Sequence, residues 1–493
     1  MTLGKLLLYI GAIALVLTLL IGLLKKGHKS WIMTFLQNFT GVLFVISGWV
    51  KAIDPMGTAF KMEQYFAEFE STFEGTWFAF IAPVFPWLSQ HAIWFSVFMI
   101  ILEIVVGVLL IIGHRARLTS WIFLLVIAFF TVLTGFTFLT GYVPPGENFF
   151  AFSKWVNYDP TNMRVTDCGC FGDFIKLEPR ISFYKDVVLL IPALIFVFRH
   201  RDMHQLFSTR VRNAIAMVLP VGLLFYCLSN FMWNEPHADF RPFKVGVDID
   251  ERKAAEEEAQ ASVQILTWKL RNKADGRIVE LSNDTYMKDF RSYPKEEWEI
   301  IGQTKSEPFM AATKISDFEL VDLEGNSVTA DILENPDPLL LIVCYKLKGK
   351  ESFEQRIVRD SVFVQDTIAT GDIIRVVRTF DKMVERTVTE PNYTWDDDYI
   401  EIFRERLNPL IAQAAGQGTE AYGVAGAAAA PKIMTFMEAV DATYPIYEAD
   451  DVMLKTIMRS NPGLLLLKDG RILGKWHWRH LPDIQTVKQL TGE

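Results

Sequence analysis

Several features that would assign a protein to a common class are missing from this sequence. Long apolar runs are scarce after residue 233, since nearly all of them come before it, and the later sequence is that of a soluble domain. A basic patch with interleaved aromatic residues is also absent there and the net charge is −9, so nucleic acid is not an expected partner. Cysteine is scarce: the 493 residues include four, yet two of them stand in the stretch DCGCFGD at 167–173.

The apolar residues gather in the first half of the chain, which we interpret as a membrane domain. The mean hydropathy is +0.20, and 51% of the residues are hydrophobic. A helix needs about 20 apolar residues to cross the hydrocarbon core of a bilayer. Six stretches meet this requirement: about 3–24, 33–53, 92–113, 118–143, 181–198 and 213–232. The lipid bilayer is therefore an expected partner.

Three of the apolar stretches need comment. The fifth predicted span has Lys185 and Asp186 near its start and Pro192 inside it. The stretch TWFAFIAPVFPWLS at 76–89 is short and contains two prolines, so we expect an interfacial or re-entrant segment there. The first span carries its positive charges after the apolar run and lacks a small-residue cleavage site, so we do not expect a removed signal peptide.

Lysine and arginine are distributed unequally between the predicted loops. The short loops 25–30, 114–117 and 199–212 contain three, two and four of them, whereas the long loops 54–91 and 144–180 contain five together. Short loops rich in lysine and arginine remain on the cytoplasmic side. We therefore predict a multi-pass protein of the inner (cytoplasmic) membrane, with the N-terminus, both long loops and everything after residue 233 in the periplasm.

Three motifs follow one another in the membrane half. GVLFVISGWVKAIDPMG at 41–57 closes a span with a lysine and a DP turn, LEIVVGVLLIIGHRAR at 102–117 has an acid in mid-span, and DCGCFGD comes later. In this order they resemble the DoxX family, and the cysteine loop resembles its MauE branch. The resemblance covers roughly 33–198 and implies a four-helix membrane module linked to disulfide formation in partner proteins.

Glu103 and Lys51 are candidate site residues within the predicted spans. A carboxylate in mid-span costs about 2.5–3.5 kcal/mol unless it is protonated or paired. Glu103 either contacts a proton or a quinone head group, or is a neutral acid that bonds Ser47 or a backbone carbonyl and locks the bundle. Lys51 either reaches toward Glu103 or snorkels to the membrane surface as an anchor. No cofactor is certain from the sequence, and a quinone is the one considered.

Cys168 and Cys170 can be joined only if the chain bends, because bridged Cα atoms lie within about 7 Å of each other. Gly169 permits that bend, and the small strained ring would exchange readily. The flanking Asp167 and Asp173 would raise the thiol pKa, which argues against a strongly activated nucleophile. Three interpretations stay open: redox exchange, a structural disulfide or packed thiols, and metal binding, for which the sequence offers no nearby histidine.

The stretch 234–315 reads as a small β-rich collar close to the membrane. An acidic, alanine-rich segment at 250–262 predicts a linker or a short helix. Two β-like runs around ADG within 262–284 predict a hairpin, and EEWEIIG at 296–302 predicts a further strand. We identify no chemistry in this collar.

From residue 316 the pattern is βαβ followed by ββα. We expect two strands in 316–333, a buried strand in 338–347, a helix over 350–369, a strand over 372–380, and a strand pair in 460–478 followed by a short helix. This order resembles the thioredoxin fold in its peroxiredoxin and TlpA-like form, with an insertion near 381–430 that includes the low-complexity run AAGQGTEAYGVAGAAAA.

The resemblance to thioredoxins is incomplete at the residues that carry redox chemistry. It places Pro462 where that family has a cis-proline, at a surface that holds extended peptide. The redox cysteines would fall in YKLKGKES at 345–352, which has none. Cys344 lies within the predicted strand, where a buried thiol is inert, and Cys227 in the sixth span is expected to be packed or to face lipid. We therefore expect a domain without catalysis whose peptide-binding surface lies near Pro462.

Together these patterns predict a polytopic α-helical membrane bundle with about six spans and a DoxX-like core, joined to an α/β thioredoxin-like domain that lacks the C-x-x-C motif. The predicted divisions are an N-terminal transmembrane helix (1–32), the four-helix domain (33–198), a cytoplasmic loop with the sixth helix (199–233), the collar (234–315) and the periplasmic domain (316–493).

Two functions of different classes fit these expectations. In the first, the Cys168–Cys170 pair exchanges electrons with a quinone or a partner thiol during the maturation of envelope proteins, with Glu103 and Lys51 near the acceptor. In the second, the chain is a non-catalytic membrane scaffold or assembly factor whose periplasmic domain docks a partner protein. The presence of the Cys168–Cys170 pair favours the redox function. The absence of a second cysteine pair in the thioredoxin-like domain favours the scaffold.

The predicted orientation can be tested with a reporter enzyme that is active only outside the cytoplasm. We expect activity when it is fused after residue 493 and none when it is fused after Arg117, because short basic loops stay in the cytoplasm. Alkaline phosphatase assays on whole cells measure both fusions. An inactive fusion after residue 493 beside an active one after Arg117 would contradict the orientation.

Overall fold

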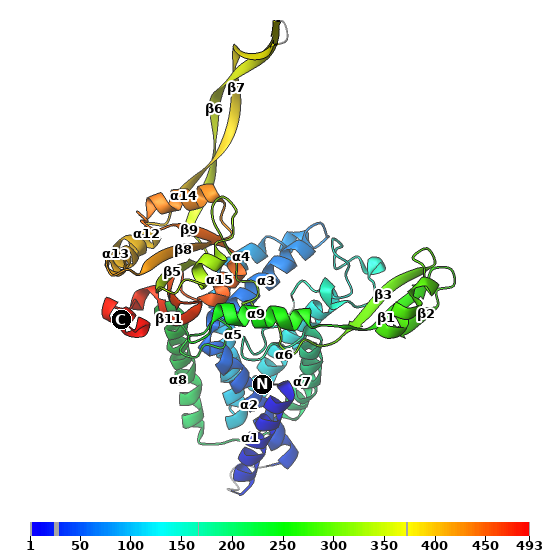
Figure 1. Cartoon of the computed structure of the whole chain (residues 1–493). Helices are drawn as coiled ribbons and strands as arrows, with labels where there is room; N and C mark the ends of the chain where they lie inside the picture. The colour runs from blue at the N-terminus through cyan, green and yellow to red at the C-terminus, as the bar shows by residue number, and fades with distance from the viewer. Residues whose placement is uncertain (1, 24–28, 166, 371–372, 493) are drawn as a thin grey trace. The chain divides into compact units, whose positions relative to one another are not determined.

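The computed structural model describes residues 2–23, 29–165, 167–370 and 373–492 (Figure 1). They form two compact units. The first comprises Met1–Lys244 together with Thr456–Ser460, and the second comprises Val245–Lys455 together with Asn461–Glu493. Most of the basic loop predicted at 25–30 lies outside the described residues, which resume at Lys29.

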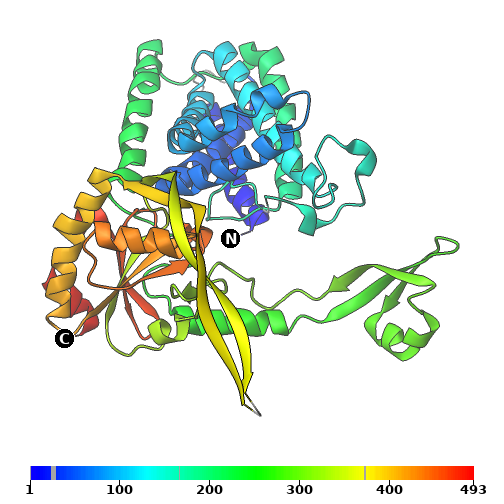
Figure 2. The same ribbon diagram turned by 90° about the horizontal axis from the view of Figure 1, so that it is seen from above.

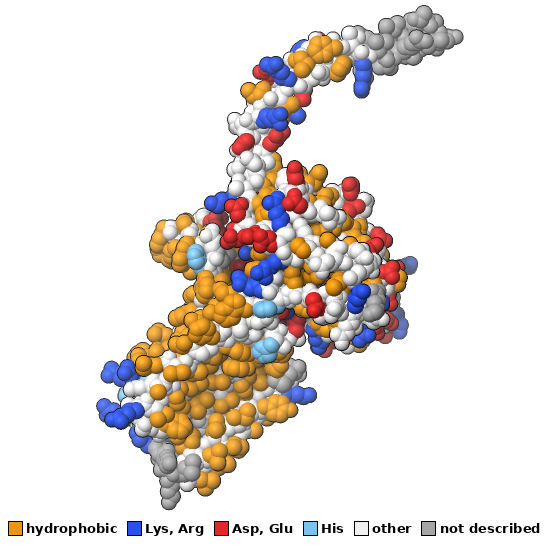
Figure 3. Space-filling view, turned by 90° about the vertical axis from the view of Figure 1, so that its left-hand side faces the viewer, with side chains coloured by type: hydrophobic (Ala, Val, Ile, Leu, Met, Phe, Trp, Pro, Cys, Tyr) orange, Lys and Arg blue, Asp and Glu red, His pale blue; other side chains and the backbone are white. Residues whose placement is uncertain are grey.

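The first unit is helical, and its described residues include six helices that are long and apolar enough to cross a membrane. They are α1 (Leu3–Leu23), α2 (Trp31–Ile53), α5 (Ala92–Ile112), α6 (Ala116–Thr140), α7 (Pro179–Arg199) and α8 (Thr209–Leu228). The six predicted spans are thus confirmed as helices, including α7, which has Pro192 inside it. On the face shown in Figure 3 the surface of these helices consists largely of hydrophobic side chains, as contact with lipid requires.

The connection between α2 and α5 is mostly helical, although no helix is predicted there. Asp54 caps α3 (Pro55–Phe73) by accepting a hydrogen bond from the Gly57 amide at 3.0 Å. Pro55 takes the first helical position, where its missing N–H leaves no bond unmade. The stretch 76–89 forms a 3₁₀ turn and the seven-residue helix α4 (Val84–Gln90), which is too short to span a bilayer, as predicted.

Helices α2 and α5 approach each other closely because glycines line their contact. A Cβ atom on Gly41 would lie 2.7 Å from the carbonyl oxygen of Gly107, and a Cβ atom on Gly107 would lie 2.7 Å from the carbonyl oxygen of Gly41. A Cβ atom on Gly48 would lie 2.5 Å from the Ile104 side chain. Small residues commonly allow such contacts between membrane helices. Here the close approach lets the long side chains of Lys51 on α2 and Glu103 on α5 meet.

The second unit begins with a helix and a three-stranded antiparallel sheet in the order β2-β1-β3. Asp248 caps α9 (Ile249–Ala261), the segment expected as a linker or short helix. Strands β1 (Ile265–Asn272) and β2 (Ile278–Ser282) confirm the hairpin around ADG, and β3 (Trp298–Lys305) confirms the further strand. The short helix α10 (Asn283–Asp289) follows β2.

A six-stranded mixed sheet in the order β11-β10-β5-β8-β9-β4 occupies the rest of the second unit. Strands β5, β8 and β9 are mutually parallel, whereas β10 runs antiparallel to β5, β11 to β10 and β4 to β9. The strands are β4 (Leu320–Val321), β5 (Leu339–Cys344), β8 (Glu420–Gly426), β9 (Ile446–Ala449), β10 (Gly463–Lys468) and β11 (Arg471–His477). The helices around them are α11 (Thr329–Leu333), α12 (Asp397–Ile402), α13 (Asn408–Ala415), α14 (Ala430–Ala439), α15 (Asp451–Ile457) and α16 (Ile484–Thr491).

Several predicted elements of this sheet are confirmed. Strand β5 is buried at all six positions, and β10 and β11 form the predicted pair around the DG turn. The Asn461–Pro462 peptide bond is cis, as the resemblance implies. The stretch 316–333 differs from its prediction: β4 is two residues long, Val321 bridges to Ser327, and α11 follows.

The helix predicted over 350–369 is wrong. This stretch is strand β6 (Gly349–Thr370), which pairs with β7 (Ile373–Trp395) in a long twisted ribbon that leaves the sheet (Figure 2). The predicted strand over 372–380 lies mostly in β7, in the ribbon rather than in the sheet, and residues 371–372 lie outside the described residues. β-Branched residues favour strands, and cross-strand ion pairs such as Arg359–Glu385 at 2.9 Å support the pairing.

The second parallel strand of the sheet is therefore β8 at Glu420–Gly426, inside the stretch predicted to be a low-complexity insertion. The small residues of this stretch have a packing role. A Cβ atom on Gly423 would lie 2.8 Å from the Ile446 side chain of β9, and one on Gly426 would lie 2.6 Å from the carbonyl oxygen of Tyr345. The segment that leaves the six-stranded sheet is the β6–β7 ribbon.

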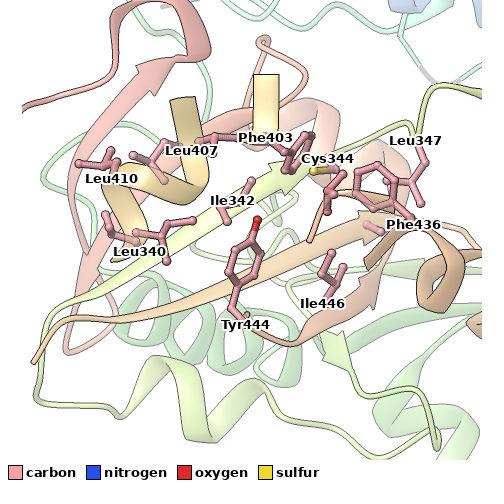
Figure 4. Packing of buried hydrophobic residues seen from close by; sticks show 14 of the residues in the cluster. Leu340, Ile342, Cys344, Leu347, Phe403, Leu407, Leu410, Phe436, Tyr444 and Ile446 are labelled. Atoms are coloured by element: carbon pink, nitrogen blue, oxygen red, sulfur yellow. The ribbon is translucent and has the colours of Figure 1, made fainter. Parts of the chain in front are cut away.

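The core of the second unit lies between the sheet and the helices α12–α14, and Cys344 is part of it (Figure 4). Its neighbours in this apolar cluster include Phe403 and Phe436. Cys344 is only 1% exposed, and burial raises the pKa of its thiol to about 12, an effect that a hydrogen bond with Tyr399 reduces. The expectation of an inert packed thiol at this position agrees with this environment.

We expect the second unit to show no thiol reductase activity, because the Cys344 thiol is buried and stays protonated at neutral pH. The test uses full-length protein in which Cys168 and Cys170 are both replaced by serine, with insulin reduction as the measurement. The same protein with the additional change Cys344→Ala is the matched control. Reduction by the first variant above the level of the control would contradict the expectation.

Candidate functional site

The first unit contains a cavity between helices α2, α3, α5, α6 and α7 and the loop that follows α6. Both thiols of the DCGCFGD stretch line this cavity, together with Lys51 of α2 and Glu103 of α5. Four of the five predicted site residues, which come from three separate parts of the sequence, therefore meet at one place. Pro462 belongs to the second unit.

The cysteine loop is folded into the helical unit by its glycines. Gly169 has a φ of +59° and Gly172 a φ of +54°, a left-handed conformation that other residues rarely adopt. The Gly172 amide donates a hydrogen bond to the Gly169 carbonyl oxygen at 3.1 Å, which closes a turn around Cys170 and Phe171. The Phe171 side chain is fully buried in the apolar core of the unit. The bend predicted at Gly169 is confirmed.

Polar contacts hold the loop on both sides of the cysteines. The Ser47 hydroxyl donates to the Cys170 carbonyl oxygen at 2.8 Å. Asp167 pairs with Lys61 at 3.0 Å, and Asp173 pairs with Arg459, in the segment Thr456–Ser460 of the same unit, at 3.0 Å. Both flanking acids are thus paired with cations, and Asp167 still contributes to the raised pKa of Cys168, as predicted.

Arg459 also ties the loop to the start of α3. Its guanidinium bonds both carboxylate oxygens of Asp54, at 2.7–2.9 Å. Burial would raise the pKa of Asp54, but the charge and hydrogen bonds of Arg459 outweigh it and lower that pKa below its usual value. The two carboxylates that Arg459 bridges belong to the cap of α3 and to the cysteine loop, so these two parts of the site are fixed to each other.

The two thiols have unequal environments. Cys168 is 8% exposed, whereas Cys170 is half-buried and lines the cavity, and both are free thiols. Burial raises the pKa of Cys168 to about 12, and the neighbouring Cys170 adds to this, while the nearby hydroxyl groups of Ser182 and Tyr65 lower it. The pKa of Tyr65 is itself raised, first by burial and then by Cys168, so its hydroxyl stays protonated. Cys168 is therefore a protonated, buried sulfur beside two hydroxyl donors.

Lys51 and Glu103 form an ion pair in the floor of the cavity. Their side chains are 7% and 5% exposed, so both charges are withdrawn from solvent. The interpretation of Lys51 as a snorkelling anchor is wrong for this arrangement, because its ammonium is buried and lies 5.4 Å from the centre of the Phe130 ring. The partner expected for Glu103, Ser47, bonds the cysteine loop instead.

A second buried ion pair was not predicted. Lys185 and Asp186 at the start of α7 lie 2.7 Å apart, and the Thr134 hydroxyl of α6 donates to Asp186 at 3.1 Å. The Lys185 ammonium interacts electrostatically with Cys170 and lies 5.9 Å from the centre of the Phe171 ring. The signal for this pair is present in the sequence, because two charges at the start of an apolar span are costly unless they have partners.

Metal binding finds no added support from the structure. Among the described residues, no group of three or more His, Cys, Asp and Glu side chains has the arrangement of a metal site. Comparison of the chain with protein-family models, with curated proteins and with solved structures gives no match. The chemistry of the site is therefore argued from its geometry.

The buried Lys51–Glu103 pair can be tested with a double-mutant cycle. Lys51→Met should lower the free energy of unfolding by about 3–5 kcal/mol, because Glu103 is left as an uncompensated buried charge. The double variant Lys51→Met/Glu103→Met should recover most of this loss. Denaturation of the detergent-solubilised protein measures the two single variants, Lys51→Met and Glu103→Met, and the double variant.

The exposed pair Lys154–Glu147, 2.8 Å apart, provides the control. Lys154→Met should cost less than about 1 kcal/mol, because exposed pairs are screened by water. Losses that simply add in the Lys51/Glu103 double variant would show that the two residues do not stabilise each other.

Proposed function

We propose that the first unit is a membrane-embedded thiol–disulfide oxidoreductase that acts in the maturation of envelope proteins. One observation carries the proposal: the two thiols line a cavity inside the helical unit, one accessible and one buried, beside buried lysine–carboxylate pairs. Perturbed titratable groups that converge on an apolar cavity are typical of active sites. The DoxX and MauE resemblance of residues 33–198 points to the same chemistry.

The proposed exchange starts from the Cys168–Cys170 disulfide. A partner thiolate attacks the Cys170 sulfur, forms a mixed disulfide and breaks the Cys168–Cys170 bond, and the released Cys168 sulfur takes up a proton. A second thiolate of the partner then attacks the partner sulfur of the mixed disulfide and releases Cys170. Two electrons pass from the partner to the cysteine pair, and the partner gains one disulfide.

The surroundings of the two sulfurs suit these roles. A leaving sulfur with a high pKa departs slowly unless it is hydrogen-bonded or protonated as the bond breaks, and Tyr65 and Ser182 are the donors beside Cys168. The Lys185 ammonium offers a positive charge to Cys170 when that sulfur is released as a thiolate. The accessible sulfur thus has a cation beside it, and the buried sulfur has neutral donors.

The cavity also fits the quinone considered from the sequence. Apolar side chains such as Leu43, Ile100 and Phe130 line it, and Lys51 and Lys185 are the donors that would hold the ring oxygens. A bound quinone would accept the two electrons and two protons that restore the disulfide. Apolar walls with a few placed donors are the usual lining of sites for such ligands.

The second unit fits a role in presenting a partner protein in the periplasm. In support of a thioredoxin-like fold, β10 runs antiparallel to β5 and leads directly into β11. Its remaining thiol, Cys344, is buried. The burial of Cys344 favours a non-catalytic role for the second unit by itself, in which it docks a partner protein as a scaffold.

The two cysteines should behave differently when a partner is trapped. Cys168→Ser should leave the fold intact, abolish exchange, and accumulate a mixed disulfide through Cys170, because the resolving sulfur is missing. Cys170→Ser should trap far less, because the remaining sulfur is buried. Acid quenching, alkylation and mass spectrometry of the purified protein measure the trapped species.

A glutathione redox titration separates an exchanging pair from a structural bond. We expect a midpoint above about −300 mV, the value below which structural disulfides typically lie.

In the reduced protein, Lys185→Met should slow alkylation of Cys170, whereas Lys176→Met, an exposed lysine of the same loop, should not. A midpoint below −300 mV together with loss of Cys168→Ser protein from the membrane would refute the redox function.

A further inference from the structure

Lysine and arginine side chains gather at one end of the helical unit on the face shown in Figure 3. A shallow basin among the described residues is lined by four of them, from three separate segments: Lys29 before α2, Arg115 and Arg117 around the start of α6, and Arg201 after α7. All four are exposed, and none forms an ion pair with another described residue. No acidic side chain lines the basin.

The acid next to Arg201 in the sequence does not offset this charge. Asp202 follows Arg201 in sequence but pairs with Arg199 at 2.6 Å. The effect of the cations is visible at His114, in the turn between α5 and α6. Its pKa is lowered first by burial and then by the positive charges of Arg115 and Arg212. The basin is thus a region of uncompensated positive potential.

The segments that carry the cations are fixed to one another by buried contacts. The Gln37 side chain donates to the Leu110 carbonyl oxygen at 3.1 Å and accepts from the His204 amide at 2.9 Å, which ties α2, the end of α5 and the segment after α7 together. The Lys29 ammonium donates to the Arg201 carbonyl oxygen at 2.6 Å. Gln37 is fully buried, so the convergence of the cations is set by packing.

One wall of the basin is apolar. Trp121 and Leu118 of α6 line it and are 47% and 50% exposed. Tryptophan at the end of a membrane helix marks the level of the lipid head groups. A soluble anion would gain nothing from this wall, whereas a lipid would place its glycerol and first methylene groups against it.

We propose that this basin binds the phosphodiester group of an anionic phospholipid. Basic pockets between membrane helices bind head groups of this kind. The four unpaired cations exceed the charge of one phosphate, so the basin favours a head group with two phosphates, such as diphosphatidylglycerol, over phosphatidylglycerol. The basin and the dithiol site share no residues, and the inference does not depend on the proposed redox function.

The test uses the full-length protein reconstituted in nanodiscs that contain phosphatidylcholine with a small fraction of diphosphatidylglycerol. Native mass spectrometry after release measures the anionic lipid that each protein molecule retains. Arg115→Gln and Arg201→Gln should each weaken retention roughly fivefold, the change that about 1 kcal/mol per cation near a membrane surface corresponds to. Arg210→Gln, an exposed arginine of α8 outside the basin, is the matched control and should change nothing.

A second pair of variants guards against a change of membrane orientation. Arg115→Lys and Arg201→Lys keep the positive charges that orient the helices but lose the paired donors that suit phosphate, so they should show intermediate retention with an unchanged melting temperature. Equal retention of diphosphatidylglycerol and phosphatidylcholine would overturn the proposal, as would equal loss in Arg210→Gln. Stabilisation of the detergent-solubilised protein by inorganic phosphate as strong as that by the lipid would assign the basin to a free anion instead.

Discussion

A charged carboxylate remains inside a helix bundle only where a cation meets it, and the pairing of Glu103 with Lys51 is the contact on which the first unit depends. The two residues belong to different helices, so the pair exists only because α2 and α5 approach closely. The glycine contact between Gly41 and Gly107 provides that approach. With both charges satisfied within the bundle, the space above them can remain a cavity with a polar floor, and the cysteine loop closes it.

The cavity is electrically balanced, because the acids around it are paired with cations. Asp167 nevertheless contributes to the raised pKa of Cys168, although Lys61 is paired with it. The cations also have different partners, because Lys185 interacts electrostatically with Cys170 while Lys61 pairs with the Asp167 side chain of the loop. The three pairs are Lys51–Glu103, Lys61–Asp167 and Lys185–Asp186.

The sequence predicts those parts of the structure that depend on local chemistry. Apolar runs of sufficient length become helices because a bilayer leaves backbone groups no other partner, and the ADG and DG turns define their hairpins. The partner of Glu103 is not local, since it depends on the rotation of α2 against α5. The helix prediction over 350–369 fails for the same reason. The strands of the β6–β7 ribbon arise from pairing between residues that are up to 46 positions apart, as Gly349 and Trp395 are.

The difference between Cys344 and Cys170 explains why we propose electron exchange for the first unit and not for the second. A thiolate forms near neutral pH only where a cation or several donors stabilise it. Cys344 lies in a strand with every residue buried, among aromatic and aliphatic side chains. Cys170 has Lys185 beside it and a cavity before it. Cys344 is therefore a packing residue, because it is buried and has no cation beside it in the described residues. Cys170 is the candidate for exchange, because it interacts with Lys185 and lines a cavity, although both thiols lie in largely apolar surroundings.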